Sequence, residues 1–334
     1  MKYKETSMSN VLSHAVTDTI HLGRKAEKED FHIALSGTAD YISHMGMVAM
    51  TVKSNNQAMH ICYHFFVNTL SDEEKARLQE AAHMLDSAVE VHLIDDNAFK
   101  TIVLSDGIAA FFYRLVAPNM VAGETDRLLY LDSDMMCHGS LELLRTLNLD
   151  KYYAAVVSDR WEEHQRQKLH TQRYFNSGMM LFNVRKWLEN DCFDDIVHRA
   201  EINASDKSKP LSKHDQDILN QMLDGKCLFI EKKYNYLYNL DRQSLFKKQP
   251  VNEDYHRQVI IHFAGHAKPW HSWVQAWPVV REYAAIQKKS PWKDVPLVPP
   301  KGHKNLHQAA RTARMQGKYG EMISLYLKYL GSKA

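Results

Sequence analysis

Short apolar runs alternate with amphipathic stretches through the first half of the chain. The runs are typical of buried strands, and the stretches between most of them are typical of helices. This alternation predicts an α/β fold with a largely parallel central sheet flanked by helices. The expected strands are Phe31–Ser36, His60–Asn68, Ala88–Asp95, Arg127–Asp132 and Tyr153–Ser158.

One of the expected helices begins with a capping box. Ser71 is followed three residues later by Glu74. The Ser71 hydroxyl and the Glu74 carboxylate are therefore placed to satisfy free backbone N–H groups of the first turn. The local signal agrees with the predicted fold class.

Two of the expected strands end in small or acidic residues. Ser36, Gly37 and Thr38 lie at the end of one strand, and Asp132 and Asp134 at the end of another. Ligands of open α/β sheets bind beyond the carboxyl ends of the strands, so a nucleotide site is expected there. The sequence contains neither G-x-G-x-x-G nor G-x-x-x-x-G-K-[ST], which counts against an ordinary dinucleotide enzyme and a P-loop NTPase.

The pair Asp132 and Asp134 suits a divalent cation. Two residues apart in an extended chain, the carboxylates point the same way. They could hold Mg²⁺ or Mn²⁺ and leave coordination positions for substrate phosphates. Asp215 and Asp217 repeat this spacing, so it is the apolar run before Asp132 that favours the first pair.

The composition is that of a globular protein. The chain has 334 residues, of which 45% are hydrophobic and 25% charged, which predicts one principal domain with an appended tail. The cysteines are scattered without a C-x-x-C pair, so their spacing offers neither a zinc site nor a disulfide framework, and a reducing cytoplasm fits best. They are Cys62, Cys137, Cys192 and Cys227.

Residues 1–30 are polar and lack the apolar stretch of a secretory signal. No run in the chain approaches the ~20 apolar residues needed to span a bilayer. We therefore expect an N-terminal extension over residues 1–30, a main domain over 31–290 and a C-terminal tail over 291–334.

The tail is basic and amphipathic, and two interpretations of it stay open. It could be a helix docked on its own domain, or a surface for anionic lipid or a lipid-linked acceptor. Its basic residues are Lys301, Lys304, Arg311, Arg314, Lys318, Lys328 and Lys333, against the single acid Glu321. Its apolar set is spaced roughly as one helical face: Leu306, Met315, Tyr319, Met322, Ile323, Tyr326, Leu327 and Leu330.

Polar residues interrupt apolar runs in the second half as well. His262 follows a short apolar run and precedes Gly265 and Lys268. One loop could thus supply an imidazole ligand, a close backbone approach and a cation for a phosphate. Alternatively, His262 is a core histidine and Lys268 a solvated charge.

Plain structural roles are equally open for three other candidates. Gly178 could be a bulge in a strand, Asp215 could be a helix N-cap, and Arg114 could simply balance the acids around it. The residues alone do not decide between these roles and a functional one.

At four ordered segments the sequence resembles glycosyltransferase family 8, the retaining glycosyltransferases of the GT-A type. Within that family it is most similar to the bacterial hexosyltransferases that build the outer core of lipopolysaccharide. The resemblance runs from about Phe31 to Lys328. It rests on L-Y-L-D-S-D, Y-F-N-S-G-M-M-L-F-N, H-D-Q-D-I-L-N and I-H-F-A-G-H-A-K-P-W.

The resemblance implies a GT-A fold, a Rossmann-like sheet with a helical basic tail, and a UDP-hexose bridged by Mn²⁺ or Mg²⁺. The implied metal ligands are Asp132, Asp134 and His262, with Ser133 between the two aspartates beside the donor. Gly265 and Lys268 match positions that meet the diphosphate.

The implied uridine site is Ser36, Gly37, Thr38 and Asp40. Many family members carry an acidic residue near the base where this chain has Thr38 followed by Ala39, which points to a weaker hold on uracil.

The implied sugar site joins several segments. Arg114 matches an arginine near the donor. Asn176, Ser177 and Gly178 match the loop under the transferred sugar, and Asp215 and Gln216 match the catalytic pair beside its anomeric carbon.

The expected activity is transfer of glucose or galactose from a UDP-sugar to the lipopolysaccharide core, with an α-linkage. The expected location is the bacterial cytoplasm, in peripheral contact with the anionic inner membrane, and no nucleic acid partner is expected. Front-side attack supported by Gln216 is favoured, and double displacement through Asp215 stays open. The alternatives are another glycan or protein acceptor, including a tyrosine of the chain itself, a metal-dependent nucleotidyltransferase, and a non-catalytic sugar-binding module.

Overall fold

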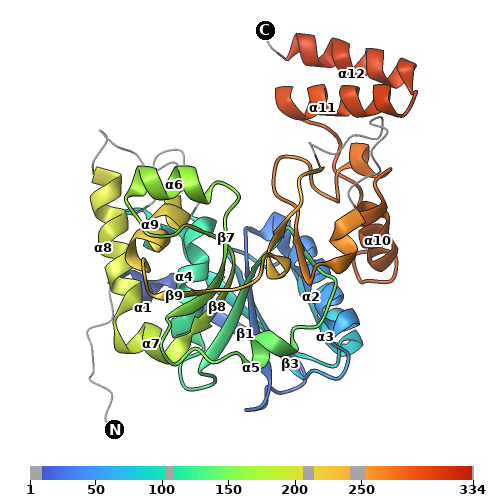
Figure 1. Cartoon of the computed structure of the whole chain (residues 1–334). Helices are drawn as coiled ribbons and strands as arrows, with labels where there is room; N and C mark the ends of the chain where they lie inside the picture. The colour runs from blue at the N-terminus through green and yellow to red at the C-terminus, as the bar shows by residue number, and fades with distance from the viewer. Residues whose placement is uncertain (1–9, 103–108, 206–213, 241–252, 333–334) are drawn as a thin grey trace.

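A computed structural model describes residues 10–102, 109–205, 214–240 and 253–332, and an eight-stranded sheet lies at its centre (Figure 1). The strands are β1 (Val16–Gly23), β2 (Phe31–Ser36), β3 (Ile61–Val67), β4 (Ala88–Ile94), β5 (Arg127–Asp132), β7 (Ala154–Ser158), β8 (Phe175–Asn183) and β9 (Cys227–Phe229). Their spatial order is β1-β4-β3-β2-β5-β8-β7-β9. Neighbours among β4, β3, β2 and β5 are parallel, as are β7 and β9, whereas β1 and β8 run antiparallel to their neighbours. The predicted α/β class with a mostly parallel sheet is confirmed.

All five strands predicted from apolar runs are present. The sequence pattern missed the other three strands of this sheet, which are β1, β8 and the three-residue β9. Among the described residues, β1 is an edge strand that pairs with β4 alone. Most of its residues are at least partly exposed, so it lacks an apolar run. β8 is buried, but Asn176, Ser177 and Gly178 interrupt its apolar pattern.

Helices cover both faces of the sheet. On one face, α2 (Ile42–Asn55) and α3 (Asp72–Met84) pack against Ile33, Phe65 and other apolar residues of the strands. On the other face lie α1, α4, α7, α8 and α9, which Figure 1 shows gathered on the opposite side of the strands from α2 and α3. Their bounds are α1 (Asn10–Ala15), α4 (Ala110–Met120), α7 (Val184–Glu189), α8 (Cys192–Ser205) and α9 (His214–Met222). The remaining helices of the main body are α5 (Glu142–Thr146), α6 (Glu162–Leu169) and α10 (Pro278–Gln287), with short 3₁₀ turns at Ala39–Tyr41, Asp96–Phe99, Lys232–Tyr234, Glu253–Arg257 and Ser272–Val274.

One of the two hydrogen bonds of the predicted capping box forms. The Ser71 hydroxyl accepts a hydrogen bond from the Glu74 backbone N–H at 3.2 Å. The Glu74 carboxylate instead accepts from the indole N–H of Trp292 at 2.9 Å. Trp292 is fully buried, and a Cβ added to Gly46 of α2 would lie 2.1 Å from its ring. The chain after α10 is therefore anchored to α2 and α3.

A second, three-stranded sheet brings distant parts of the chain together. It has the order β10-β11-β6, with β6 (Met135–Cys137), β10 (Tyr236–Leu237) and β11 (Ile260–His262). β6 begins directly after Asp134, and β11 pairs with it antiparallel so that His262 lies opposite Met135. This pairing carries His262 to the carboxyl end of β5.

The tail forms two helices, α11 (Gly302–Met315) and α12 (Tyr319–Gly331), which lie side by side in Figure 1. α11 buries Leu306, Ala309 and Ala313. No described residue of α12 is buried, and its exposed apolar side chains are Tyr319, Ile323, Tyr326, Leu327 and Leu330. The apolar set predicted as one helical face is thus divided: Leu306 packs inward, and the α12 residues line an open face. Among the described residues, no helix is long and apolar enough to cross a membrane.

Candidate active site at the carboxyl edge of the sheet

Asp132, Asp134 and His262 meet at the carboxyl end of β5. Asp132 ends β5, Asp134 lies in the turn that follows, and His262 ends β11. The His262 Nε2 atom lies 3.2 Å from Asp134 Oδ1 and 3.9 Å from Asp132 Oδ2. One ligand atom from each residue lies within 4.8 Å of the others. Two carboxylates and an imidazole are ligands that Mn²⁺ and Mg²⁺ accept in proteins.

A chain of amide groups fixes the orientation of the His262 ring. Asn176 Oδ1 accepts from the Gly178 N–H at 3.1 Å and from Asn235 Nδ2 at 2.9 Å. Asn235 therefore presents its oxygen to His262 Nδ1, 3.0 Å away. This assignment places a ring proton on Nδ1 and leaves Nε2 as the atom that faces the two carboxylates, or a cation bound between them. Two carboxylates and an imidazole nitrogen that converge in this way are a donor set that fits a divalent cation.

Gly178 lies against this cluster and has no room for a side chain. A Cβ at this position would lie 2.6 Å from Asp132 Oδ2 and 2.6 Å from His262 Cε1. The pairing of β8 with β7 shifts register here, between the Met180 and Asn176 pairs. Asn176, Ser177 and Gly178 therefore belong to a bulged strand, and the expectation of a loop at these residues is wrong.

Lys268 reaches the same cluster from the loop after β11. Its Nζ atom donates to Asp134 Oδ2 at 2.5 Å and to the Phe263 carbonyl at 2.7 Å. Burial alone would raise the pKa of Asp134, but His262 and Lys268 hold that pKa well below its usual range. Gly265, in the same loop, is exposed and has a φ of +111°, a conformation that favours glycine.

A cavity of about 280 Å³ opens beside the cluster. Of the predicted uridine residues, Ser36, Gly37 and Thr38 line it, whereas Asp40 is exposed and lies outside the lining, in which Tyr41 takes part. Other predicted site residues in the lining are Arg114, Asp132, Ser133, Asp134 and Lys268. The cavity thus joins the uridine and metal segments predicted from the sequence.

Tyr130 connects these two segments. Its hydroxyl donates to Asp132 Oδ1 at 2.9 Å and lies 2.9 Å from Ser36 Oγ. Burial raises the pKa of Tyr130 well above its usual value, so the phenol stays protonated. The Ser36 hydroxyl then donates to Tyr130, and Tyr130 donates to Asp132.

Arg114 of α4 joins the metal cluster to the sugar segments. It is 6% exposed. Its Nη2 atom lies 3.0 Å from Asp132 Oδ1, its Nε atom 3.2 Å from Asp215 Oδ2, and its Nη1 atom donates to the Ser177 carbonyl at 2.8 Å. Arg114 does balance nearby acids, but these acids belong to two different parts of the site.

Asp215, in the first turn of α9, carries a perturbed carboxyl group. Burial raises its pKa to about 6, with the charge of Asp132 adding to the effect and Arg114 opposing it. Its Oδ2 atom has no hydrogen bond in the described part of the chain, because Arg114 Nε, although close, is not aligned with it. A buried carboxylate with an open lone pair can act on a bound substrate. The residues before His214 lie outside the described part, so the N-cap interpretation of Asp215 stays untested.

Gln216 is held at both ends of its amide. Its Oε1 atom accepts from the Ser177 N–H at 3.1 Å and from Asn176 Nδ2 at 3.2 Å. Its Nε2 atom donates to Tyr174 Oη at 2.9 Å and is 3.4 Å from Asp159 Oδ2. The side chain is therefore fixed beside Asp215.

Sequence reasoning missed three of the supporting residues. Asp159 directly follows β7, so the rule that sites lie at the carboxyl ends of strands could have found it. Asn235 and Tyr174 carry no comparable signal, because their roles depend on contacts with His262 and Gln216 across the fold.

Comparisons with known proteins agree with this geometry. The model of the family described as Glycosyl transferase family 8 matches residues 32–274, and that of Glycosyl transferase family 8 C-terminal matches 277–333. The lipopolysaccharide glucosyltransferase WaaO of Escherichia coli K12 is 25% identical, over 99% of this chain and 98% of its own length. The lipopolysaccharide 1,3-galactosyltransferase of Salmonella typhimurium LT2 is 27% identical, over 92% of this chain and 93% of its own.

Among solved structures, the galactosyltransferase LgtC, in complex with donor and acceptor sugar analogs, has a TM-score of 0.64. It is 21% identical and aligns over 78% of this chain and 96% of its own. At this identity the likeness concerns the fold, which is the GT-A arrangement of a mostly parallel sheet between helices.

Proposed function

This chain belongs to glycosyltransferase family 8, and we propose that it transfers glucose or galactose from a UDP-sugar to the lipopolysaccharide core. The bond formed is an α-glycosidic bond, and the reaction depends on Mn²⁺ or Mg²⁺. The two near-full-length relatives act on lipopolysaccharide, which supports this acceptor. The observation that carries the proposal is the convergence of Asp132, Asp134 and His262 next to Arg114 and Asp215.

The donor would bind with its diphosphate at this convergence. A divalent cation held by Asp132, Asp134 and His262 supplies positive charge that stabilises the leaving diphosphate. Lys268 adds a second positive charge. Two of its three N–H groups are directed to Asp134 and the Phe263 carbonyl, which leaves one for a phosphate oxygen.

The uridine would enter the cavity lined by Ser36, Gly37 and Thr38. Tyr41 contributes an aromatic ring that is 40% exposed, and a base could stack on it. The Thr38 hydroxyl is the polar group offered in place of an acidic side chain near the base.

Transfer with retention would proceed by front-side attack. The bond between the sugar C1 and the phosphate oxygen breaks, and its electron pair leaves with UDP. The acceptor hydroxyl oxygen bonds to C1 on the same face, and its proton passes to the departing phosphate oxygen. Gln216 is fixed by hydrogen bonds at both ends and would steady the positive charge that develops on the sugar.

Asp215 would contribute charge beside C1. With a pKa of about 6, its carboxylate is mostly ionised at pH 7 and above, which stabilises an oxocarbenium-like sugar. A covalent sugar trapped on Asp215 and detected by mass spectrometry would replace front-side attack by double displacement. Wild-type-like turnover of Gln216→Ala would remove Gln216 from the scheme.

The activity is tested by release of UDP. The protein is incubated with Mn²⁺, UDP-glucose or UDP-galactose, and truncated lipopolysaccharide cores. We expect core-dependent release from one donor, and a loss of roughly a hundredfold or more in kcat for Asp132→Asn. Asp150→Asn, at an exposed position outside the site, serves as the charge-matched control and keeps full activity.

Three results would count against the proposal. Undiminished activity of Asp132→Asn would show that activity does not depend on the proposed metal site. Release of pyrophosphate from UTP would indicate a nucleotidyltransferase. Binding of UDP-sugar without turnover on any core would indicate a sugar-binding module. Intact mass after incubation with donor alone tests for a tyrosine acceptor on the chain itself, because only transfer to the protein adds the mass of a hexose to it.

We also propose that α12 rests on the anionic cytoplasmic face of the bacterial inner membrane, where the acceptor would be met. Its apolar face is exposed along its length, from Tyr319, which is 64% exposed, to Leu330, which is 48% exposed. The tail also carries exposed basic residues, on α11, on α12 and next to them: Lys301, Lys304, Arg311, Arg314, Lys318 and Lys328. Exposed apolar residues beside cations are the pattern of a helix that lies in the membrane interface.

Sedimentation with phosphatidylglycerol vesicles tests the membrane contact. Deletion of residues 304–334 and the point variant Leu327→Asp are both expected to reduce binding. Ser324→Asp adds the same charge to α12 at an exposed polar position and should reduce binding less. Equal sedimentation of Leu327→Asp and the wild type would exclude this role of α12.

A further inference from the structure

A row of imidazole rings crosses the sheet away from the candidate active site. His32 lies on β2, Cys62 and His64 on β3, and His92 on β4. His32 pairs in register with Cys62, so these side chains share one face of the sheet. His32 Nδ1 lies 2.9 Å from His64 Nε2, and His64 Nδ1 lies 3.1 Å from His92 Nε2. His32 is four residues before Ser36, or about 13 Å along the strand from the donor edge.

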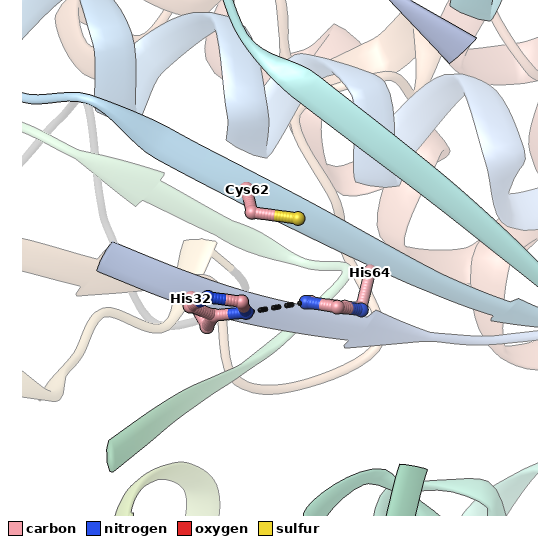
Figure 2. A group of neighbouring side chains, drawn as sticks. All are labelled: His32, Cys62 and His64. Carbon is pink, nitrogen blue, oxygen red and sulfur yellow. Dashed lines mark hydrogen bonds between the residues drawn. The ribbon is translucent and has the colours of Figure 1, made fainter. Parts of the chain in front are cut away.

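Three of these side chains form a compact group of metal-ligand atoms (Figure 2). One ligand atom each from His32, Cys62 and His64 lies within 4.8 Å of the others. All three side chains are at most 2% exposed. Glu124, in the turn before β5, has a carboxylate oxygen 4.0 Å from His32 Nδ1, and we take it as the candidate for a fourth ligand.

One nitrogen of this row has no partner. A row of neutral imidazoles uses one N–H and one lone pair in each ring-to-ring hydrogen bond, so one nitrogen is left over at the end of the row. That nitrogen is His32 Nε2, which is buried and has no hydrogen-bond partner among the described residues. An ion on the Nδ1 side of His32 would leave Nε2 to carry the ring proton, so Nδ1 is the ligand atom of His32.

Burial keeps the three side chains uncharged. It lowers the pKa of His32 to about 4 and that of His64 well below its usual value, so both rings keep lone pairs at neutral pH. It also raises the pKa of the Cys62 thiol, and the carboxylates of Glu90, Asp30 and Glu124 raise it further. Zn²⁺ would therefore have to displace the thiol proton.

A hollow in the surface reaches His32, one member of the group. A hollow of about 780 Å³ is lined by His32 together with Glu90 and Glu124. An ion could enter through this hollow without passing the donor cavity, which has a different lining.

We propose that His32, Cys62 and His64, completed by Glu124, bind a Zn²⁺ ion that holds β2, β3 and the turn before β5 together. Two imidazoles, a thiolate and a carboxylate are a zinc ligand set, and the thiolate selects against Mg²⁺ and Mn²⁺. On binding, the S–H bond of Cys62 breaks, a Zn–S bond forms and the proton goes to solvent. The proton between His32 Nδ1 and His64 Nε2 moves to the ring nitrogen that does not bind the ion. Each ion therefore releases about one proton, that of the thiol.

The sequence spacing of the cysteines excluded a zinc site because it considers only ligands near one another in the chain. Here the ligands come from two strands and a turn. The sheet register brings His32 beside Cys62, and no spacing rule contains that information.

Zinc binding is measured on the Asp132→Asn, Asp134→Asn double variant, because Zn²⁺ could otherwise occupy the donor edge. Equilibrium dialysis against a zinc buffer should show one ion bound per chain. Adding Cys62→Ser should weaken binding at least tenfold. Adding Cys192→Ser should change nothing, since Cys192 is also buried but belongs to none of the metal-ligand groups among the described residues.

Cobalt provides a test that needs no variant of Cys62. Co²⁺ bound to the double variant should show the near-ultraviolet charge-transfer band of a thiolate ligand. Absence of this band, or zinc affinity unchanged by Cys62→Ser, would overturn the proposal. If the far-ultraviolet circular dichroism of Cys62→Ser shows that this variant does not fold, the cobalt spectrum of the double variant decides whether the thiolate is a ligand. UDP release with Mn²⁺ by Cys62→Ser in the otherwise wild-type chain should stay at the wild-type rate, so this proposal can fail without the proposed transferase activity failing.

Discussion

Replacing Asp215 by Asn should stabilise the protein, and only above a defined pH. The folded protein raises the pKa of this carboxyl from 3.8 to about 6, chiefly by burial. A difference of this size corresponds to about 3 kcal/mol at 1.36 kcal/mol for each pKa unit. Above pH 6 the wild type holds an ionised carboxylate in surroundings that disfavour it, whereas Asn is neutral at every pH.

The sign of the pH dependence follows from the direction of the shift. Because the folded state binds the Asp215 proton more tightly than the unfolded state, the wild type loses stability from this group as pH rises from about 4 to about 6. Asp215→Asn removes that loss. The variant should therefore exceed the wild type by about 3 kcal/mol at pH 8 and by well under 1 kcal/mol at pH 4.

Urea denaturation of both proteins at pH 4, 6 and 8, followed by circular dichroism, measures this difference. EDTA is present throughout, because a cation at Asp132 and Asp134 would alter the charges around Asp215. Asp217→Asn would be an unsuitable control, since Asp217 accepts a hydrogen bond from Tyr174, so exposed Asp150→Asn is used. A stability difference that is constant from pH 4 to pH 8, or a variant less stable at pH 8, would refute the reasoning.

Three further predictions concern close packing and ligand orientation. Gly178→Ala should lower Mn²⁺ affinity and UDP release at least tenfold, because its Cβ would displace Asp132 or His262; unchanged Mn²⁺ titration would contradict this. Asn235→Ala should weaken Mn²⁺ binding by roughly 10–100-fold through loss of the hydrogen bond that orients His262, and an affinity equal to the wild type would exclude that role. Gly46→Ala should lower the free energy of unfolding by about 1–3 kcal/mol in urea, because the new methyl group overlaps the Trp292 ring; an unchanged midpoint would show that this contact relaxes freely.

Much of the fold could be predicted because buried parallel strands have continuous apolar sequences. β2, β3 and β5 are buried along most of their length, and each forms a distinct apolar run in the sequence. β1 escaped prediction because an edge strand needs little apolar surface. β8 escaped because the residues that serve the site also interrupt its pattern.

The candidate site was predictable where one short segment carries the signal. Asp132 and Asp134 end an apolar run, and the structure places them beside His262 as the family resemblance implies. Asn235 and the histidine row were not predictable, because their partners depend on tertiary contacts and strand register. Asp40 shows a further limit, since adjacency in sequence to Thr38 did not bring it into the cavity lining.

The pairing of β6 with β11 also sets the order in which the protein assembles its candidate metal ligands. Asp134 and His262 lie far apart in the chain and meet only because β11 adds to β6. Contacts of such long sequence separation form slowly and late. A chain still growing on the ribosome therefore carries both aspartates long before it carries the imidazole. The cluster of Asp132, Asp134 and His262 can therefore assemble only after residue 262 has been made.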